Sequence, residues 1–261
     1  MLRVSNRKIA GFEVRWASFP GFSILFDNPG ENYLKPRSSK LFELHNKVHE
    51  DSALHFYTIL DEGMARLNVN ALLNQFLFCA LPSTTYHVTV WSGLNCKNIV
   101  NIDPQYRPMA EKWLSDLPQS TCNTSDDILQ LPLMSSLCTK QDWNINFRFD
   151  HLDIWNSSVL AVVLRPDDDS LTIFEQFVEE RTRLNTQFHE RFNLFTDSKT
   201  YTPHVSLGYF ANEEGAQKAM SSLHDWNTWF KSALQDNVLS FNHASLYGLT
   251  DMITFFKTDA C

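Results

Sequence analysis

Hydrophobic and polar residues alternate along this chain in two different periods. Short runs rich in β-branched and aromatic residues predict β-strands at 22–26, 53–60, 85–91, 145–155, 159–165, 202–210, 238–247 and 252–257. Between them, hydrophobic positions at helical spacing predict helices at 37–49, 63–79, 104–117, 170–193 and 213–234. Because strands alternate with helices, the pattern predicts an α/β or α+β fold.

The same pattern contains a weak internal repeat. The sequence TYHVTV at 85–90 matches TPHVSL at 202–207, and FDHLDIW at 149–155 matches FNHASLY at 241–247. In the first half only, an extra segment without a clear period, 118–142, separates the two matched strands. We interpret this segment as a surface insertion, either a lid over a site or an excursion without a catalytic role.

A repeat of this kind predicts two similar lobes. The 261 residues fit one large domain or two small lobes. We expect a single bilobal domain with an N-terminal extension at about 1–52, a first lobe at about 53–155 and a second lobe at about 159–257. Two sheet-plus-helix lobes related by an approximate twofold axis would place their equivalent strands across a central groove.

Each copy of the repeat carries a histidine followed two positions later by a hydroxyl residue. His87 and Thr89 share one face of their predicted strand, because residues i and i+2 point to the same side, about 6.5–7 Å apart. His204 and Ser206 share a face in the same way. A His-x-Ser/Thr triplet alone is a weak signal, and 243–245 contains a third one. The repeated context sets the first two apart.

These side chains suit phosphodiester chemistry. Cleavage of a phosphodiester needs a base that activates water or a hydroxyl and an acid that protonates the departing oxygen. Histidine, with an ordinary pKa near 6.5, performs either role at neutral pH. Threonine and serine hydroxyls donate hydrogen bonds to non-bridging phosphate oxygens. The four motif residues together therefore predict a phosphodiesterase site that needs no metal.

The paired motifs resemble those of the 2H phosphoesterase superfamily, which includes LigT-like (2′-5′ RNA ligase-like) proteins and RNA cyclic phosphodiesterases. Their signature is two His-x-Thr/Ser motifs, each inside a strand, one per lobe. The resemblance covers about 53–257 and implies a bilobal fold, no cofactor, and hydrolysis of a 2′,3′-cyclic phosphate or related phosphodiester of a nucleotide or RNA end. It also implies that His87 and His204 act as acid and base and that Thr89 and Ser206 bind phosphate.

Charge narrows the class of substrate. Acidic residues outnumber basic ones thirty to twenty-two, the formal net charge is −8, and no basic run is present. Proteins that bind long nucleic acids neutralise many phosphates with clustered Lys and Arg. Leu207-Gly208-Tyr209 follows the second motif, where superfamily members often have a basic residue. We therefore expect a small nucleotide or a chain end as substrate, not a long nucleic acid.

Other features of the sequence bear on location. No stretch approaches the roughly 18 apolar residues of a membrane span, and the first residues do not form a secretory signal. The five cysteines are odd in number and form no CxxC pair, which favours reduced thiols. We expect a cytoplasmic protein without membrane association. The sequence leaves the oligomeric state open.

Further side chains near the motifs are candidates for substrate stacking or for orienting the catalytic groups. The aromatic candidates are Tyr86, Trp91 and Tyr209, with ordinary sheet packing as the alternative. Strand alternation places Trp91 on the same side as the first motif, which makes it the preferred candidate. His151 and His243 occupy matching places in the repeat. They either line the groove or have a structural role.

No metal site is expected. His45 and His49 have a spacing of i, i+4 on a predicted helix, but no HExxH motif or third ligand accompanies them. A solvated helix face explains them better. Asp167, Asp168 and Asp169 precede a predicted helix, where carboxylates act as caps and favour the helix dipole.

Two functional classes compete. The first is an enzyme that hydrolyses a phosphodiester. The second is a non-catalytic nucleotide- or RNA-end-binding module that keeps the groove and uses the histidines as ligands. A third possibility is an RNA-processing subunit that acts only within a complex. Turnover with a bell-shaped pH dependence would separate the first two classes, because acid–base catalysis needs one neutral and one protonated imidazole.

Overall fold

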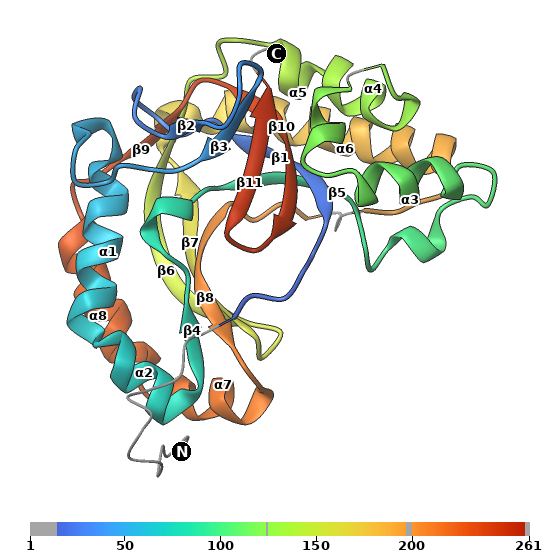
Figure 1. The fold of residues 1–261 in the computed structure, drawn as a ribbon. Helices are drawn as coiled ribbons and strands as arrows, with labels where there is room; N and C mark the ends of the chain where they lie inside the picture. Colours follow the sequence, from blue (N-terminus) through green and yellow to red (C-terminus); the bar gives the residue numbers. More distant parts are fainter. Residues whose placement is uncertain (1–14, 124, 197–199, 259–261) are drawn as a thin grey trace.

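Two antiparallel sheets flanked by helices make up the protein (Figure 1). The structure, a computed structural model, describes residues 15–123, 125–196 and 200–258. Sheet A has the strand order β2-β3-β11-β10-β1-β5, and sheet B has the order β4-β8-β7-β6-β9. This architecture confirms the predicted α+β class and its two-lobed character.

The strands of sheet A are β1 (Gly21–Phe26), β2 (Leu34–Pro36), β3 (Leu41–Leu44), β5 (Thr89–Asn95), β10 (Ala244–Asp251) and β11 (Thr254–Thr258). Those of sheet B are β4 (Phe78–Ala80), β6 (Ile145–Trp155), β7 (Val159–Pro166), β8 (His204–Phe210) and β9 (Leu239–Phe241). The helices are α1 (His55–Leu67), α2 (Val69–Phe76), α3 (Arg107–Ser115), α4 (Asp127–Met134), α5 (Ser136–Thr139), α6 (Leu171–Phe192), α7 (Glu213–Met220) and α8 (Leu223–Leu234).

The helices divide between the two sheets. Figure 1 shows α1, α2, α7 and α8 together along one side of the molecule, where α2, α7 and α8 contact strands of sheet B. Helices α3 to α6 lie on the other side. The buried positions of α6 include Phe177, Leu184 and Phe188, whose spacing of seven and four residues places them on one apolar face. Phe177 stacks on Phe26 of β1 with 4.8 Å between ring centroids, so α6 covers sheet A.

The two sheets do not follow the predicted lobe boundaries. The division between 155 and 159 falls in the turn of the β6–β7 hairpin, and both strands of that hairpin belong to sheet B. The first copy of the repeat thus supplies β5 to sheet A and β6–β7 to sheet B. The second copy supplies β8 to sheet B and β10–β11 to sheet A. Each copy donates its hairpin to the sheet that holds the other copy's motif strand.

Of the predicted extension at 1–52, residues 21–44 contribute three strands to sheet A. Strand β1 pairs with both β10 and β5, so it lies inside the sheet. The helix predicted at 37–49 is wrong, because β2 and β3 form a hairpin there. The strand predicted at 53–60 is also wrong. Leu54, Tyr57 and Leu60 are buried at helical spacing, which a short apolar run does not distinguish from a strand.

The insertion at 118–142 is part of the packed fold. Helices α4 and α5 contact α6 and β10, and Ile128, Leu129 and Leu137 are fully buried. None of its described residues lines the cavity that holds the motif residues. The interpretation as a lid is therefore wrong, because the apolar side chains of this segment are directed into the core and not across the groove.

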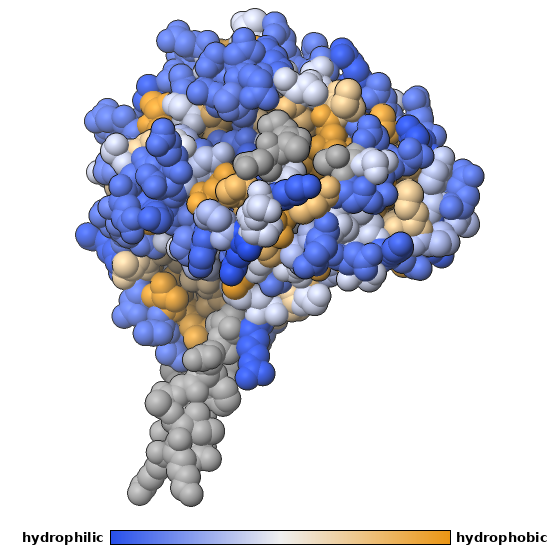
Figure 2. All heavy atoms as spheres, turned by 45° about the horizontal axis from the view of Figure 1, so that its top comes forward, coloured by the Kyte–Doolittle hydropathy of each residue, from blue (hydrophilic) through white to orange (hydrophobic). Residues whose placement is uncertain are grey.

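The surface seen in Figure 2 is mostly hydrophilic, with small separate hydrophobic patches. Large hydrophobic side chains that are exposed occur singly, at positions such as Val100, Met134 and Phe195. No helix in the described ranges is long and apolar enough to cross a membrane. Cys79, Cys96 and Cys122 carry free thiols.

Candidate active site

The two motif strands meet where the sheets approach each other. Val88, immediately before β5, and Val205 of β8 form an isolated antiparallel β-bridge. His204 is the first residue of β8, whereas His87 precedes β5 by two residues and follows a 3₁₀ turn at 83–85. The strand predicted at 85–91 therefore begins later than expected, but the chain through His87 and Val88 is held in place by the bridge.

A cavity of about 770 Å³ lies at this junction. All four motif residues line it: His87, Thr89, His204 and Ser206. Tyr209, one of the aromatic candidates, lines it as well. The fold thus brings together two segments that are more than a hundred residues apart in the sequence, as the repeat predicts.

The imidazole of His87 is fixed from two sides. Its Nδ1 lies 2.7 Å from the carbonyl oxygen of Thr85. Because a carbonyl only accepts, Nδ1 carries the hydrogen, and Nε2 is the nitrogen available to the cavity. The ring of Phe255 in β11 packs against the imidazole with 4.5 Å between centroids.

His204 repeats this arrangement. Its Nδ1 lies 3.0 Å from the carbonyl oxygen of Thr202, again two residues earlier, so Nδ1 carries the hydrogen here too. The ring of Trp155 at the end of β6 meets the imidazole edge-to-face at 4.4 Å between centroids. Phe255 comes from the second repeat and Trp155 from the first. Each histidine is therefore packed by a hairpin that the other repeat supplies.

The electrostatics of the two histidines are coupled. Burial lowers the pKa of His87 to about 4, against the hydrogen bond to Thr85, which raises this pKa. Positive charge on His204 lowers the pKa of His87 further. At neutral pH His87 is therefore a neutral imidazole with an unprotonated Nε2. This is the protonation state that a general base requires.

A β-bulge follows each motif and selects which side chains reach the cavity. In β5, Thr89 lies opposite Leu25 and Trp91 lies opposite Ile24, so Val90 is an extra residue. The extra residue reverses the alternation: Trp91 faces the core with no exposed surface, and Ser92 lines the cavity in its place. The expectation that Trp91 shares the face of the first motif is thus wrong.

The second motif strand has the matching bulge. Ser206 lies opposite Ala161 and Gly208 opposite Leu160, so Leu207 is the extra residue. After the bulge, Tyr209 is directed to the same side as Ser206 and lines the cavity. Burial raises the pKa of the Tyr209 phenol, and a hydrogen bond with Ser206 opposes this shift. Tyr209 is thus a neutral hydroxyl group beside the second motif.

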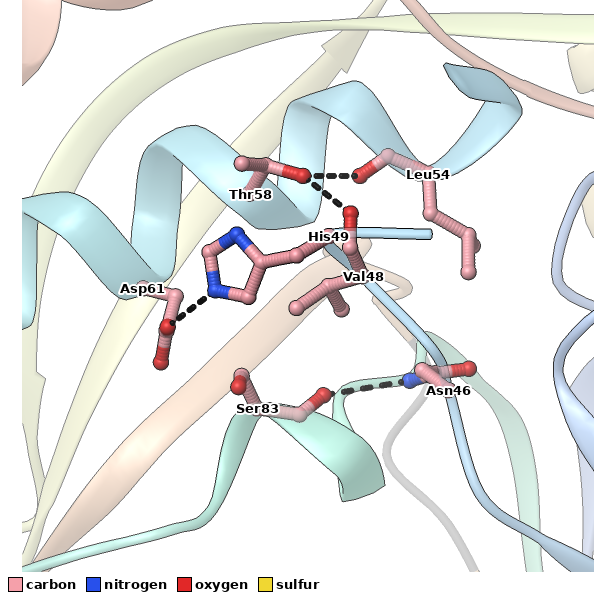
Figure 3. Close-up of polar contacts among 7 residues, drawn as sticks. All are labelled: Asn46, Val48, His49, Leu54, Thr58, Asp61 and Ser83. Atoms are coloured by element: carbon pink, nitrogen blue, oxygen red, sulfur yellow. Dashed lines mark hydrogen bonds and ion pairs between the residues drawn. The ribbon is translucent and has the colours of Figure 1, made fainter. Parts of the chain in front are cut away.

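Tyr86 is a core residue and does not reach the cavity. Its ring is 1% exposed and packs edge-to-face on Tyr57. Its backbone carbonyl accepts hydrogen bonds from Asn28 Nδ2 at 2.9 Å and from Asn46 Nδ2 at 2.7 Å. Asn46 also donates to the carbonyl of Ser83 (Figure 3). These two buried amides hold the chain immediately before His87, a role that the sequence pattern does not indicate.

The two histidines of the second repeated pair lie away from the cavity. His151 is exposed and its Nδ1 is 2.8 Å from Asp150 Oδ2. His243 lies between β9 and β10, and its backbone carbonyl accepts a hydrogen bond from the backbone N–H of Asp27. Neither lines the cavity, so the proposal that they orient catalytic groups has no support from the geometry.

The polar residues assigned to structural roles have local partners. His49 Nε2 lies 2.9 Å from Asp61 Oδ2 (Figure 3). His45 directly follows the last residue of β3. Among the described residues, no group of three or more His, Cys, Asp or Glu side chains has the geometry to hold a metal ion. Asp167 does not cap α6, because its carboxylate accepts a hydrogen bond from Arg148 Nε at 2.8 Å.

Several cavity residues carry no signal in a single sequence. Trp155 and Phe255 reach the histidines only through the exchange of hairpins between the sheets. Arg181, in the middle of α6, lines the cavity although it is 2% exposed. Tyr201 lines it too and donates a hydrogen bond to the carbonyl of Thr89 at 3.1 Å. Of these cavity residues, only Tyr201 has a signal in the sequence, and a weak one: it belongs to the aromatic residues near the second motif.

No protein-family model matches this chain, and no curated protein is significantly similar to it. Among solved structures, the fold is similar to that of the conserved protein of unknown function ATU0111 from Agrobacterium tumefaciens str. C58, with a TM-score of 0.52 and 15% identity over 93% of this chain and 85% of that chain. Usb1 from Kluyveromyces marxianus, solved with uridine monophosphate, aligns over 90% of this chain and 98% of its own at 10% identity, with a TM-score of 0.35. The first likeness shows that this fold occurs in another solved protein.

Proposed function

We propose that this protein is a metal-independent phosphodiesterase of the 2H phosphoesterase type, formed by a single bilobal catalytic domain. The observation that carries the proposal is the matched placement of the two His-x-Thr/Ser motifs in one cavity. In both motifs the histidine Nδ1 faces a backbone carbonyl two residues earlier, and Nε2 is the ring nitrogen to which we assign the chemistry. Two equivalent imidazoles in one cavity are the groups that an in-line displacement at phosphorus requires.

His87 is assigned the role of general base. With its pKa lowered to about 4, its Nε2 is unprotonated at neutral pH and accepts a proton from the attacking water. The new bond joins the water oxygen to phosphorus. His87 is thereby converted to an imidazolium, and this positive charge compensates the negative charge that develops on the phosphoryl oxygens.

His204 is assigned the complementary role of general acid. As the bond from phosphorus to the ester oxygen breaks, protonated His204 transfers its Nε2 proton to that oxygen. For a 2′,3′-cyclic phosphate the product is a 2′- or 3′-phosphomonoester. Thr89 and Ser206 line the cavity beside the histidines and donate hydrogen bonds to the non-bridging oxygens. No cofactor is needed for these steps.

The proposed substrate is a nucleotide or the end of an RNA chain. A volume of about 770 Å³ falls within the roughly 300–1,000 Å³ typical of small-molecule sites. The net charge of −8 disfavours a surface that holds many phosphates of a long polynucleotide. Trp155 and Tyr209 line the cavity with aromatic surface against which a base can pack.

The first test is hydrolysis of a panel of 2′,3′-cyclic and linear nucleotides in the presence of EDTA, with wild type and His204→Ala. We expect turnover by the wild-type protein that EDTA does not reduce and that the substitution abolishes. Nucleotide binding without turnover of any member of the panel would contradict the proposal and favour the binding module. Turnover that persists in His204→Ala would contradict the two-histidine mechanism.

A further inference from the structure

A short segment ahead of β1 crosses from one sheet to the other beside the cavity. Residues 15–20 lead into β1, and Figure 1 shows this stretch, in dark blue, running from beside β8 towards β1 past the turn of the β10–β11 hairpin. In the sequence it lies ahead of both copies of the repeat, so the paired motifs do not account for it. We call residues 15–20 the strap.

The strap is fixed to sheet A at its C-terminal end. The N–H of Phe19 donates to the carbonyl of Thr250 in β10 at 2.8 Å, and the carbonyl of Pro20 accepts from the N–H of Cys96 at 2.9 Å. Because a residue before proline is restricted to extended conformations, Pro20 also limits the backbone at Phe19. The Phe19 side chain lines the cavity, and Lys97, which does not line it, packs on the ring with Nζ 5.4 Å from the centroid. The position of the Phe19 ring is therefore well defined.

The other end of the strap is held to sheet B by packing of Trp16. Its indole meets the ring of Tyr209 in β8 edge-to-face, with 6.0 Å between centroids. Ala17 and Ser18 are exposed, and the backbone of residues 16–18 forms no hydrogen bond to the backbone of another described residue. Segments with exposed backbone and few buried contacts open most readily. Release of Trp16 thus opens the strap while the end at Phe19 stays in place.

A continuous apolar wall joins the strap to the first motif. Phe255 packs on the imidazole of His87, and Leu249 lies directly across from Phe255 in the β10–β11 pair. These two apolar side chains belong to a small buried cluster against which Phe19 and Met252 pack. All four apolar side chains line the cavity. The wall therefore extends from the histidine assigned as base to the ring that the strap supplies.

The same wall is connected to the end of the strap that opens. The hydroxyl of Tyr209 donates to the sulfur of Met252 at 3.6 Å, so the ring that holds Trp16 also contacts the β10–β11 turn. Both Tyr209 and Met252 line the cavity. A change in the position of Trp16 therefore alters the support of a side chain in the cavity lining.

The chemistry of this wall favours one part of a nucleotide. Apolar side chains offer no hydrogen bond to a phosphate oxygen or a sugar hydroxyl, and removing such groups from water without a partner costs free energy. A nucleobase has a flat π-face that stacks on aromatic side chains. Phe19 and Phe255 provide aromatic surface at the two ends of the wall. The base, and not the ribose or the phosphate, is the group that suits it.

We propose that the strap is part of the substrate-binding site: it closes over the nucleobase of the substrate, with Phe19 in contact with the base and Trp16 as the positioning residue that holds the strap on Tyr209. This inference rests on the proposed function, because it takes the phosphodiester to lie at the two motifs. Trp155 beside His204 is the competing surface for the base, and the test separates the two.

The binding test compares adenosine 2′,3′-cyclic phosphate with 1-O-methylribose 2,3-cyclic phosphate, which lacks the base. Both are titrated by calorimetry in a His204→Ala background, in which we expect no turnover of the ligand. There Phe19→Ala is expected to weaken binding of the adenosine compound about 10- to 100-fold, as loss of base stacking does, and to leave affinity for the base-free compound unchanged. Phe195→Ala is the matched control, because it removes an exposed ring outside the cavity.

Closure of the strap is measured separately by limited proteolysis in the same background. Trypsin cleaves after arginine, and Arg15 is exposed at the start of the strap. The adenosine compound is expected to slow this cleavage, because proteolysis follows the population of the open form, and the base-free compound is not. Trp16→Ala should abolish the protection, whereas Trp16→Phe keeps a ring against Tyr209 and should restore it.

Equal affinity for the two compounds, or equal losses on both in Phe19→Ala, would overturn the inference. A preference for the base that persists in Phe19→Ala and disappears in Trp155→Leu would also overturn it and assign the base to Trp155. Cleavage at Arg15 that the adenosine compound does not slow would contradict closure of the strap. If Phe19→Ala does not fold, this proteolysis of the unaltered strap decides.

The inference and the proposed function fail separately. Base-dependent binding and protection of Arg15, without turnover by the wild-type protein, would support the strap and contradict the proposed function. Turnover by the wild-type protein, together with equal affinity for the two compounds in the His204→Ala background, would support the proposed function and overturn the role of the strap.

Discussion

Val88 and Val205 face each other in the antiparallel bridge that joins the two motif strands. Each lies between the histidine and the hydroxyl residue of its own motif. The histidine and the hydroxyl residue of each motif thus flank the bridge, and all four line the same cavity.

Replacement of either histidine by alanine is expected to abolish turnover. His87→Ala removes the proposed base and His204→Ala the proposed acid, and general acid–base catalysis contributes about 10²–10⁴-fold for each group. Turnover is measured with 2′,3′-cyclic nucleotides, and thermal unfolding serves as the check that the variants are folded. His151→Ala is the control, because His151 is exposed and outside the cavity. Normal activity of His87→Ala would contradict the proposed mechanism.

Removal of the motif hydroxyls is expected to have smaller effects. Thr89→Ala and Ser206→Ala should each reduce kcat by about 10²-fold, because each removes one donor to the phosphoryl oxygens. Thr89→Ser and Ser206→Thr keep the donor and should retain most of the activity. A loss in Thr89→Ser as large as that in Thr89→Ala would show that packing, and not the hydroxyl, is the property required at this position.

The acidic limb of the pH–rate profile is expected at unusually low pH. Burial lowers the pKa of His87 to about 4, so this imidazole is unprotonated above that pH and is protonated as the pH falls through it. A base with this pKa makes kcat/KM fall towards acid pH with an apparent pKa near 4, and not near the ordinary 6.5. The profile is measured between pH 3 and 9 with buffers of constant ionic strength. An acidic limb near 6.5 would show that His87 is not the base.

The bulge beside the second motif is expected to depend on Gly208. A Cβ atom at this position would lie 2.4 Å from the carbonyl oxygen of Cys79 in β4. Because this carbonyl oxygen belongs to the backbone and cannot rotate away, Gly208→Ala forces the two strands apart and should lower the free energy of unfolding by about 1–3 kcal/mol. Denaturant unfolding measures this, with Ser240→Ala on an exposed face of β9 as control. An unchanged midpoint would show that β4 shifts without cost.

The residue pattern along the chain was enough to predict the elements with long, regular periodicity. Strand β6 was predicted with its observed bounds, and α6 with bounds one residue wider at each end. The errors fall where the apolar run is short. At 53–60, Leu54, Tyr57 and Leu60 satisfy a buried strand as well as a helix face, and only packing against the rest of the core decides between them.

The sequence by itself determined that there are two motifs and that they are equivalent copies of a repeat, because His-x-Thr and His-x-Ser recur in matching surroundings. What the tertiary structure decided is everything that depends on register and on strand exchange. Because Val90 is an extra residue, the side chain of Trp91 points into the core and that of Ser92 points into the cavity. Exchange of the hairpins sets Phe255 against His87 and places Trp155 on His204. Local periodicity contains neither fact, since a bulge forms through pairing with a neighbouring strand and contacts between repeats form only when both sheets are assembled.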